Sequence, residues 1–224
     1  MTDTRSSAVT VPGDDALRAD PDASYHRAAT APRMPPAERA VVSAQLGRVA
    51  RGDNAVVHRC VYGLPSVVRV HPYLEDGAPF PTVFWLTCPL ARRHVGRLEA
   101  DGAMALANRR LEEDPDCAAV YAAAAERYVG FRDRLDRPIA GDPTAGGMPT
   151  HVKCLHVHHA HFLATGDNPV GAWTHRRLTP MACPGPCVEE SLLADAYGPL
   201  PPDVAMSGAW EHAAPWGQRP RGFR

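Results

Sequence analysis

The run THVKCLHVHHAH, residues 150–161, gathers side chains that bind metals and move protons. It holds five of the eleven histidines of the 224-residue chain, together with Cys154. Successive residues of a helix rotate by about 100°, so Cys154, His158 and His161 would share one helical face. A thiolate and two imidazoles on one face can supply three ligands to zinc or anchor one corner of an iron site.

The same run has a simpler interpretation. A helix with several histidines can be polar on one face and carry Cys154 as a small apolar residue of the core. His156 and His159 would point away from the face predicted to bind metal, so they would lie behind the ligands or in solvent. Histidine is a rare residue, and its concentration in this run favours metal binding.

Cys60 and Cys88 lie at the expected ends of elements, where sites are commonly assembled. Cys60 closes an apolar run, and Cys88 precedes Pro89, which suits the first turn of a helix. Unpaired N–H groups and the dipole at a helix N-terminus stabilise a thiolate, which favours metal ligation or nucleophilic reactivity at Cys88. If the ends of the strands lie together, Cys60, Cys88 and Cys154 can meet.

The remaining cysteines give weaker signals. Cys183 and Cys187 form CPGPC, a spacing that allows two ligands to one metal, although the prolines restrict the loop and the segment is expected to be a tail. Cys117 lies in an alanine-rich helix and is expected to pack. The chain has no GxGxxG, GxxxxGK[ST], HExxH or GxSxG motif, so nucleotide and serine hydrolysis lose their usual support.

Hydrophobic periodicity predicts an α+β fold with a small, mostly antiparallel sheet of about three strands and four to five helices. The expected strands are residues 54–62, 65–73 and 82–88, the first two forming a hairpin and the third central because both its faces are apolar. The expected helices are residues 36–47, 90–100, 115–135 and 149–165. The last should begin at Pro149 and end at Gly166.

Composition predicts one domain between two disordered tails. Residues 1–36 and 180–224 are rich in Pro, Gly and small polar residues, which leaves residues 37–179 as the folded part. The net charge of −1 is too small to hold a polyanion, so no nucleic-acid partner is expected. No apolar stretch is long enough for a membrane span or a signal peptide, which predicts a cytoplasmic protein without membrane insertion or structural disulfides.

Several blocks of the chain, in order, resemble the domain-of-unknown-function 501 family of actinobacteria. These are QLGRVARG, RCVYGLPSVV, DGAPFPTVFWLTCP, LEADGAM, GGMPTHVKCLHVHHAH and NPVG, which together run from Gln45 to Gly171. The resemblance implies a small cytoplasmic protein whose gene often lies near those of enolase, a septum-formation initiator and an exopolyphosphatase. It implies no activity. The positions that match the family pattern are Cys60, Cys88, Cys154, His156 and His161.

Three functions stay open on this basis. The leading hypothesis is a metal or iron–sulfur site of Cys60, Cys88, Cys154 and His161, holding zinc or a cluster, with His156 and His158 as further candidates. The second is an enzyme that uses Cys88 or Cys60 as a nucleophile with a histidine base. The third is a non-catalytic interaction module with a protein partner in cell division or phosphate metabolism.

Overall fold

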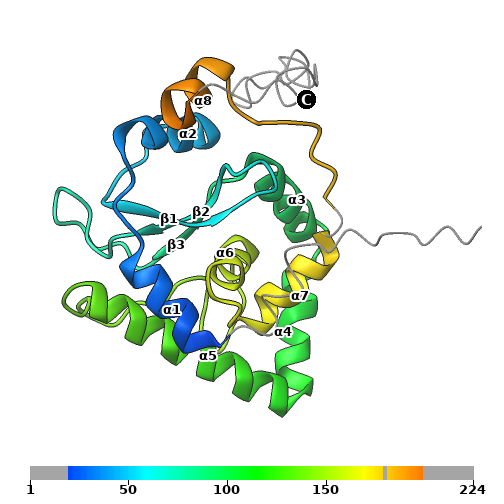
Figure 1. Ribbon diagram of the computed structural model, residues 1–224. Coiled ribbons are helices and arrows are strands. Elements are labelled where there is room, and N and C mark those ends of the chain that lie inside the picture. Colours follow the sequence, from blue (N-terminus) through cyan, green and yellow to red (C-terminus); the bar gives the residue numbers. More distant parts are fainter. Residues whose placement is uncertain (1–19, 179–180, 199–224) are drawn as a thin grey trace, which may run out of the picture.

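The computed structural model describes residues 20–178 and 181–198 and has an α+β fold, as predicted (Figure 1). The described residues form eight helices instead of the expected four to five. The elements are, in order, α1 (Pro21–Thr30), α2 (Pro36–Leu46), β1 (Asn54–Arg59), β2 (Pro65–Val70), β3 (Phe84–Leu86), α3 (Pro89–Ala100), α4 (Ala103–Glu113), α5 (Pro115–Leu135), α6 (Leu155–Thr165), α7 (Pro169–Leu178) and α8 (Glu190–Tyr197). No described helix combines the length and the apolar character needed to cross a membrane.

The three strands form an antiparallel sheet in the order β1-β2-β3, and β1 and β2 are the predicted hairpin. The prediction that the third strand is central is wrong, because β2 lies between the other two. The apolar character of β3 has another cause: Phe84 and Leu86 pack into the main core on one face, while Trp85 packs with Val68 and Val70 on the other. Both faces of the sheet are therefore covered, even at its edge.

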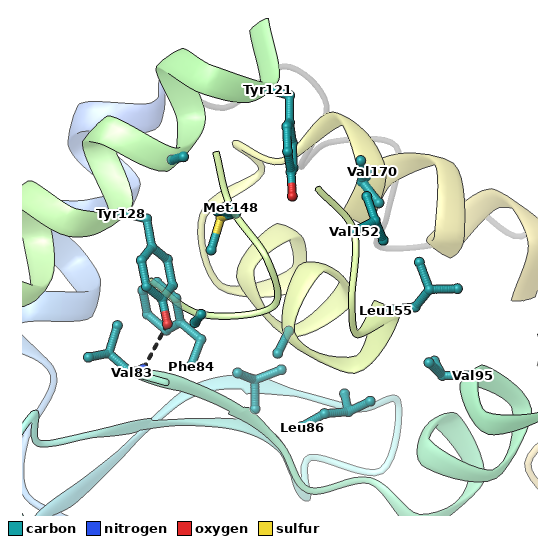
Figure 2. Packing of buried hydrophobic residues seen from close by; sticks show 14 of the residues in the cluster. Val83, Phe84, Leu86, Val95, Tyr121, Tyr128, Met148, Val152, Leu155 and Val170 are labelled. Carbon is teal, nitrogen blue, oxygen red and sulfur yellow. Dashed lines mark hydrogen bonds between the residues drawn. The ribbon is translucent and has the colours of Figure 1, made fainter. Parts of the chain in front are cut away.

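Helix α6 lies between the sheet and the helices α1, α5 and α7, whereas α2 and α8 lie on the opposite side of the sheet (Figure 1). Leu155, Ala160 and Phe162 of α6 have no exposed surface. Figure 2 shows Phe84 and Leu86 of β3 beneath this helix, and a hydrogen bond of 2.8 Å from the Val83 N–H to the Tyr128 hydroxyl that joins the sheet to α5. The sheet and α5 thus enclose α6 within the core.

The predicted tail over residues 1–36 is wrong where the structure describes it, since α1 occupies Pro21–Thr30. The helix has a local start signal, because the Asp20 carboxylate accepts a hydrogen bond of 3.0 Å from the Asp22 N–H before a proline at the first helical position. Tyr25 and Ala28 then enter the main core. Only two apolar residues of α1 enter this core, which is too few for a periodic pattern to be visible in the sequence. Residues 1–19 lie outside the described residues.

The second predicted tail, residues 180–224, is also ordered where described. Helix α8 packs against α2, with Leu193 buried beside Val41. This helix lies within the predicted tail, and the Pro- and Gly-rich residues before it form an extended connection (Figure 1). Residues 179–180 and 199–224 lie outside the described residues.

Helices α6 and α7 approach each other closely at Gly171. A Cβ atom at this position would lie 2.1 Å from the His158 carbonyl oxygen and 2.5 Å from Phe162 Cβ. We therefore expect Gly171→Ala to destabilise the protein by about 1–3 kcal/mol or more, because backbone atoms must move to admit the methyl group. Urea unfolding measures this.

The matched control is Gly96→Ala in α3, where a Cβ would meet nothing within 4 Å. We expect this change to be neutral or to stabilise the protein by about 0.5–1 kcal/mol through helix propensity. Equal effects of the two substitutions would contradict the described packing of α6 on α7.

Candidate functional site

Cys154 immediately precedes α6 and does not lie on it. The prediction that the helix begins at Pro149 is wrong, and so is the shared helical face of Cys154, His158 and His161 that followed from it. Cys154 has extended backbone angles, with φ −156° and ψ 111°. The chain before it is held away from helical geometry because Asn108 of α4 pairs with both backbone groups of Val152, at 2.8 and 3.0 Å. The predicted end of the helix at Gly166 is confirmed.

The N-terminus of α6 receives its cap from another helix. Cys154 makes no capping hydrogen bond, and instead the Glu99 carboxylate, in the last turn of α3, accepts a hydrogen bond of 2.6 Å from the Leu155 N–H. An anion at this position satisfies an unpaired N–H group and interacts favourably with the helix dipole. Glu99 therefore fixes where α6 begins.

His156 faces the same carboxylate. Its Nδ1 lies 3.1 Å from Glu99 Oε1 and 3.9 Å from Cys154 Sγ, and its Nε2 lies 3.0 Å from the Arg92 carbonyl oxygen. Burial lowers the pKa of His156, but the hydrogen bond with Cys154 and the negative charge of Glu99 outweigh burial and raise it overall. The ring thus has acceptors at both nitrogens.

Glu99, Cys154 and His156 form a compact group of metal-binding atoms. One oxygen, one sulfur and one nitrogen lie within 4.8 Å of one another, and all three residues are half-buried. Within residues 20–178 and 181–198 this is the one set of three or more such groups that approach this closely. It contains two of the residues expected from the sequence, Cys154 and His156.

His158 and His161 lie elsewhere, fully buried on α6. Asn168 donates from Nδ2 to Nδ1 of both rings, at 3.2 and 3.0 Å, because its Oδ1 is occupied by the Gly171 N–H. The far nitrogen of His161 bonds to the Tyr25 hydroxyl at 2.5 Å. Burial lowers the pKa of His158 to about 4 and that of His161 to about 3, so both rings are neutral structural groups.

Cys60 and Cys88 lie at the ends of β1 and β3, as expected, but the structure does not bring them to Cys154. Cys88 caps the start of α3, whereas Glu99 lies eleven residues further along the same helix, a rise of about 16 Å. The length of α3 therefore separates Cys88 from the group around Glu99. Cys60 and Cys88 instead lie near Cys183 and Cys187. Burial raises the pKa of Cys60 and of Cys88, and Cys183 raises each further, while Cys60 and Cys88 add to the raised pKa of Cys187.

Sequence reasoning missed Glu99. A glutamate near the end of a helix is common, and its pairing with residues 155 and 156 depends on how α3 packs against α6. The available signal was its place in LEADGAM, one of the blocks in which the chain resembles the family.

Comparison with known proteins gives one match. The profile of the family described as "Protein of unknown function (DUF501)" matches residues 56–176, more than half of the chain. No curated protein and no solved structure matches. The matched region includes all three residues of the Glu99–Cys154–His156 group.

Acid should unfold this protein in part through its buried histidines. Between pH 6.5 and about 3 the unfolded chain protonates His161, while the folded protein keeps it neutral, so the unfolded state binds more protons and stability falls as the pH falls. We expect His161→Gln to reduce the slope of unfolding free energy against pH by up to about 1.4 kcal/mol per pH unit. Urea unfolding between pH 7.5 and 5 measures this. His26→Gln, at an exposed position of α1, is the control, and a reduction in slope as large as that of His161→Gln would contradict the role of burial.

Removing the carboxylate of Glu99 should loosen α6. In metal-free buffer we expect Glu99→Ala to cost about 1–2 kcal/mol of unfolding free energy, because the buried Leu155 N–H loses its acceptor. Glu99→Gln keeps an acceptor and should cost less. Glu126→Ala, at an exposed position of α5, is the control and should stay within about 0.5 kcal/mol of the wild type. A loss no greater for Glu99→Ala than for this control would contradict the capping role.

Proposed function

Because the chain belongs to the DUF501 family, whose description assigns no activity, we propose its function from the geometry of its own site: it binds a divalent metal ion, zinc foremost, through Glu99, Cys154 and His156. The observation that carries this proposal is the convergence of three different donor atoms on one point.

The separations of these atoms suit one metal ion. Bonds of about 2.3 Å to sulfur and 2.0–2.1 Å to nitrogen and oxygen, at tetrahedral angles, place sulfur and nitrogen about 3.6 Å apart and nitrogen and oxygen about 3.3 Å apart. The corresponding distances here are 3.9 Å from Cys154 Sγ to His156 Nδ1 and 3.1 Å from that nitrogen to Glu99 Oε1. These two distances lie within a few tenths of an ångström of the expected values, and the sulfur and the carboxylate oxygen lie within 4.8 Å of each other.

The imidazole of His156 is already oriented for this role. When Nε2–H donates to the Arg92 carbonyl, Nδ1 carries the lone pair, and this lone pair faces Cys154 and Glu99. A backbone acceptor behind a metal-bound histidine is the usual way in which proteins fix the tautomer of such a ligand. The carboxylate of Glu99 has lone pairs enough to keep its bond to Leu155 N–H while it binds a metal.

The number of ligands bears on what the metal would do. Structural zinc sites use four protein ligands, whereas catalytic sites use three and leave a position for water or substrate. Three protein ligands that are each half-buried correspond to the second type. We therefore propose a metal centre with one accessible position, which suits polarisation or hydrolysis of a small substrate.

The same geometry argues against a thiol enzyme at this group. In a nucleophile–base–carboxylate arrangement the nucleophile and the carboxylate contact opposite nitrogens of the imidazole. Here Cys154 and Glu99 both face Nδ1, and Nε2 is bonded to the Arg92 carbonyl. Convergence on a single nitrogen is what a shared metal requires. An enzyme using Cys88 or Cys60, and an interaction module with a protein partner, stay predictions without support from this group.

Metal titration tests the proposal. We expect chelator-treated wild-type protein to bind cobalt(II) with a sulfur-to-metal charge-transfer absorption, and zinc to displace it. Cys154→Ser and His156→Ala should each weaken binding by more than about 100-fold, because each removes a ligand. The measured quantity is the difference between wild type and variant, because the chain has five further free thiols that could add to the cobalt signal.

Cys117→Ser is the matched control, because Cys117 is a half-buried thiol on α5 outside this group. It should keep the full cobalt signal. Identical titrations of the wild type and Cys154→Ser would rule the site out, and rapid alkylation of Cys154 in a metal-free wild type would favour thiol chemistry instead.

A further inference from the structure

Four of the six cysteines gather at one end of the sheet, away from the group around Glu99. The strand register places the first two there. Arg59 of β1 pairs with Pro65 of β2, and Val67 of β2 pairs with Leu86 of β3. Cys60 comes directly after β1 and Cys88 comes two residues after β3. Both cysteines therefore lie at the end of the sheet where β2 starts, one on each side of β2. Backbone bonds extend this pairing, from the Cys60 N–H to Leu64 and from the Thr87 N–H to Ser66, both at 2.9 Å.

The connection between α7 and α8 brings the other two cysteines to this end. The hydroxyl of Tyr62, two residues after Cys60 in the turn after β1, donates to the Cys183 carbonyl at 2.9 Å. The Gln45 side-chain N–H of α2 lies 2.9 Å from the Pro65 carbonyl and 3.4 Å from Cys187 Sγ. One amide therefore links the start of β2 to the second cysteine of CPGPC.

Side-chain packing agrees with these bonds. Cys60 and Cys187 contact the same apolar cluster, which contains Val41, Leu64 and Leu193. Gly185 and Pro186, between the two cysteines of CPGPC, are buried. The CPGPC turn is thus seated on the end of the sheet, with its thiols half-buried.

The four thiols also lie near enough to influence one another. Burial raises the pKa of Cys187 to about 11, with further increases from Cys88, Cys60 and Cys183. Burial raises the pKa of Cys88 as well, with additions from Cys60 and Cys183. The thiols of Cys60, Cys88 and Cys183 thus lie within electrostatic range of Cys187, which agrees with the strand register and with the Gln45 contact.

We propose that Cys60, Cys88, Cys183 and Cys187 bind a thiophilic metal centre as four thiolates, a second site independent of the one formed by Glu99, Cys154 and His156. The two cysteines of CPGPC are separated by three residues, and cysteines that bind one metal are typically separated by about two to four. The Gln45 N–H provides a donor to the Cys187 sulfur, a kind of contact that stabilises metal-bound thiolates. Four protein ligands make this a closed, structural centre that ties the segment carrying α8 to the sheet.

Two centres use this ligand chemistry, a zinc ion and an iron–sulfur cluster. Zinc requires sulfur atoms about 3.8 Å apart, from bonds of about 2.3 Å at tetrahedral angles. Among the described residues, which include all four cysteines, no three of these sulfurs lie within 4.8 Å of one another. The wider spacing favours a cluster, in which each sulfur binds a different iron, over zinc, which would draw CPGPC closer to the sheet.

The test is elemental analysis of full-length protein purified without oxygen, comparing the wild type with the double variant Cys183→Ser/Cys187→Ser. We expect the variant to lose either about four iron ions with acid-labile sulfide and a visible absorption, or about one zinc ion. Loss of either centre supports the proposal and identifies the metal. An unchanged metal content in the double variant overturns it, as does a wild type that contains no metal beyond that lost in Cys154→Ser.

Two single variants serve as controls for the loss of metal. Cys117→Ser should change neither metal nor spectrum. Cys154→Ser tests the other site, so failure of one proposal leaves the other measurable. The far-ultraviolet circular dichroism of the double variant should match the wild type, because its substitutions lie outside the main core. If it does not, Cys187→Ser alone replaces the double variant, and the same loss of metal is expected.

Discussion

Helix α6 is enclosed by the rest of the fold, so its polar groups must find partners within the protein instead of water. This requirement organises much of the structure. The N-terminal N–H of α6 is satisfied by Glu99 of α3, and two of its histidines share the side chain of Asn168, which begins the turn into α7. The Asn168 oxygen in turn accepts from the Gly171 N–H, where α7 touches the backbone of α6. His159 Nδ1 is the one buried side-chain nitrogen of α6 left without a partner among the described residues.

The same enclosure explains why a histidine-rich helix is not by itself a metal site. Ligation needs a lone pair that faces other donors, and Asn168 occupies the Nδ1 lone pairs of both His158 and His161. His156 differs because it lies in the first turn of α6, at the edge of the core. There its Nδ1 meets a carboxylate and a thiol, and its other nitrogen meets a backbone carbonyl. Position along the helix, not residue type, separates the structural histidines from the candidate ligand.

Local signals predicted much of the fold. The hairpin, the bounds of α5 at Pro115 and Leu135 and the end of α6 at Gly166 each depend on residues that are adjacent in sequence, and each is confirmed. The start of α6, the helix α1 and the role of Glu99 were missed because each depends on a partner distant in sequence: Asn108 for Val152, the core for Tyr25 and Leu155 for Glu99. Residue type alone identified Cys154 and His156, but only the packing of α3 on α6 groups them with a third ligand.

The cysteines expected to form a single site fall into two groups because α3 stands between them. Cys88 precedes the first turn of this helix and Glu99 lies in its last, so each end collects its own donors. The two groups differ in the number and kind of their donor atoms, and this difference determines what a bound metal could do. At the end of the sheet, a metal bound by four sulfurs would have no position for substrate and would hold a segment in place. At the start of α6, a metal bound by one sulfur, one nitrogen and one oxygen would have a coordination position left for a small molecule, and the three residues are half-buried. Any chemistry performed by this protein is therefore expected at Glu99, Cys154 and His156, with the cysteines at the sheet end acting as structural support.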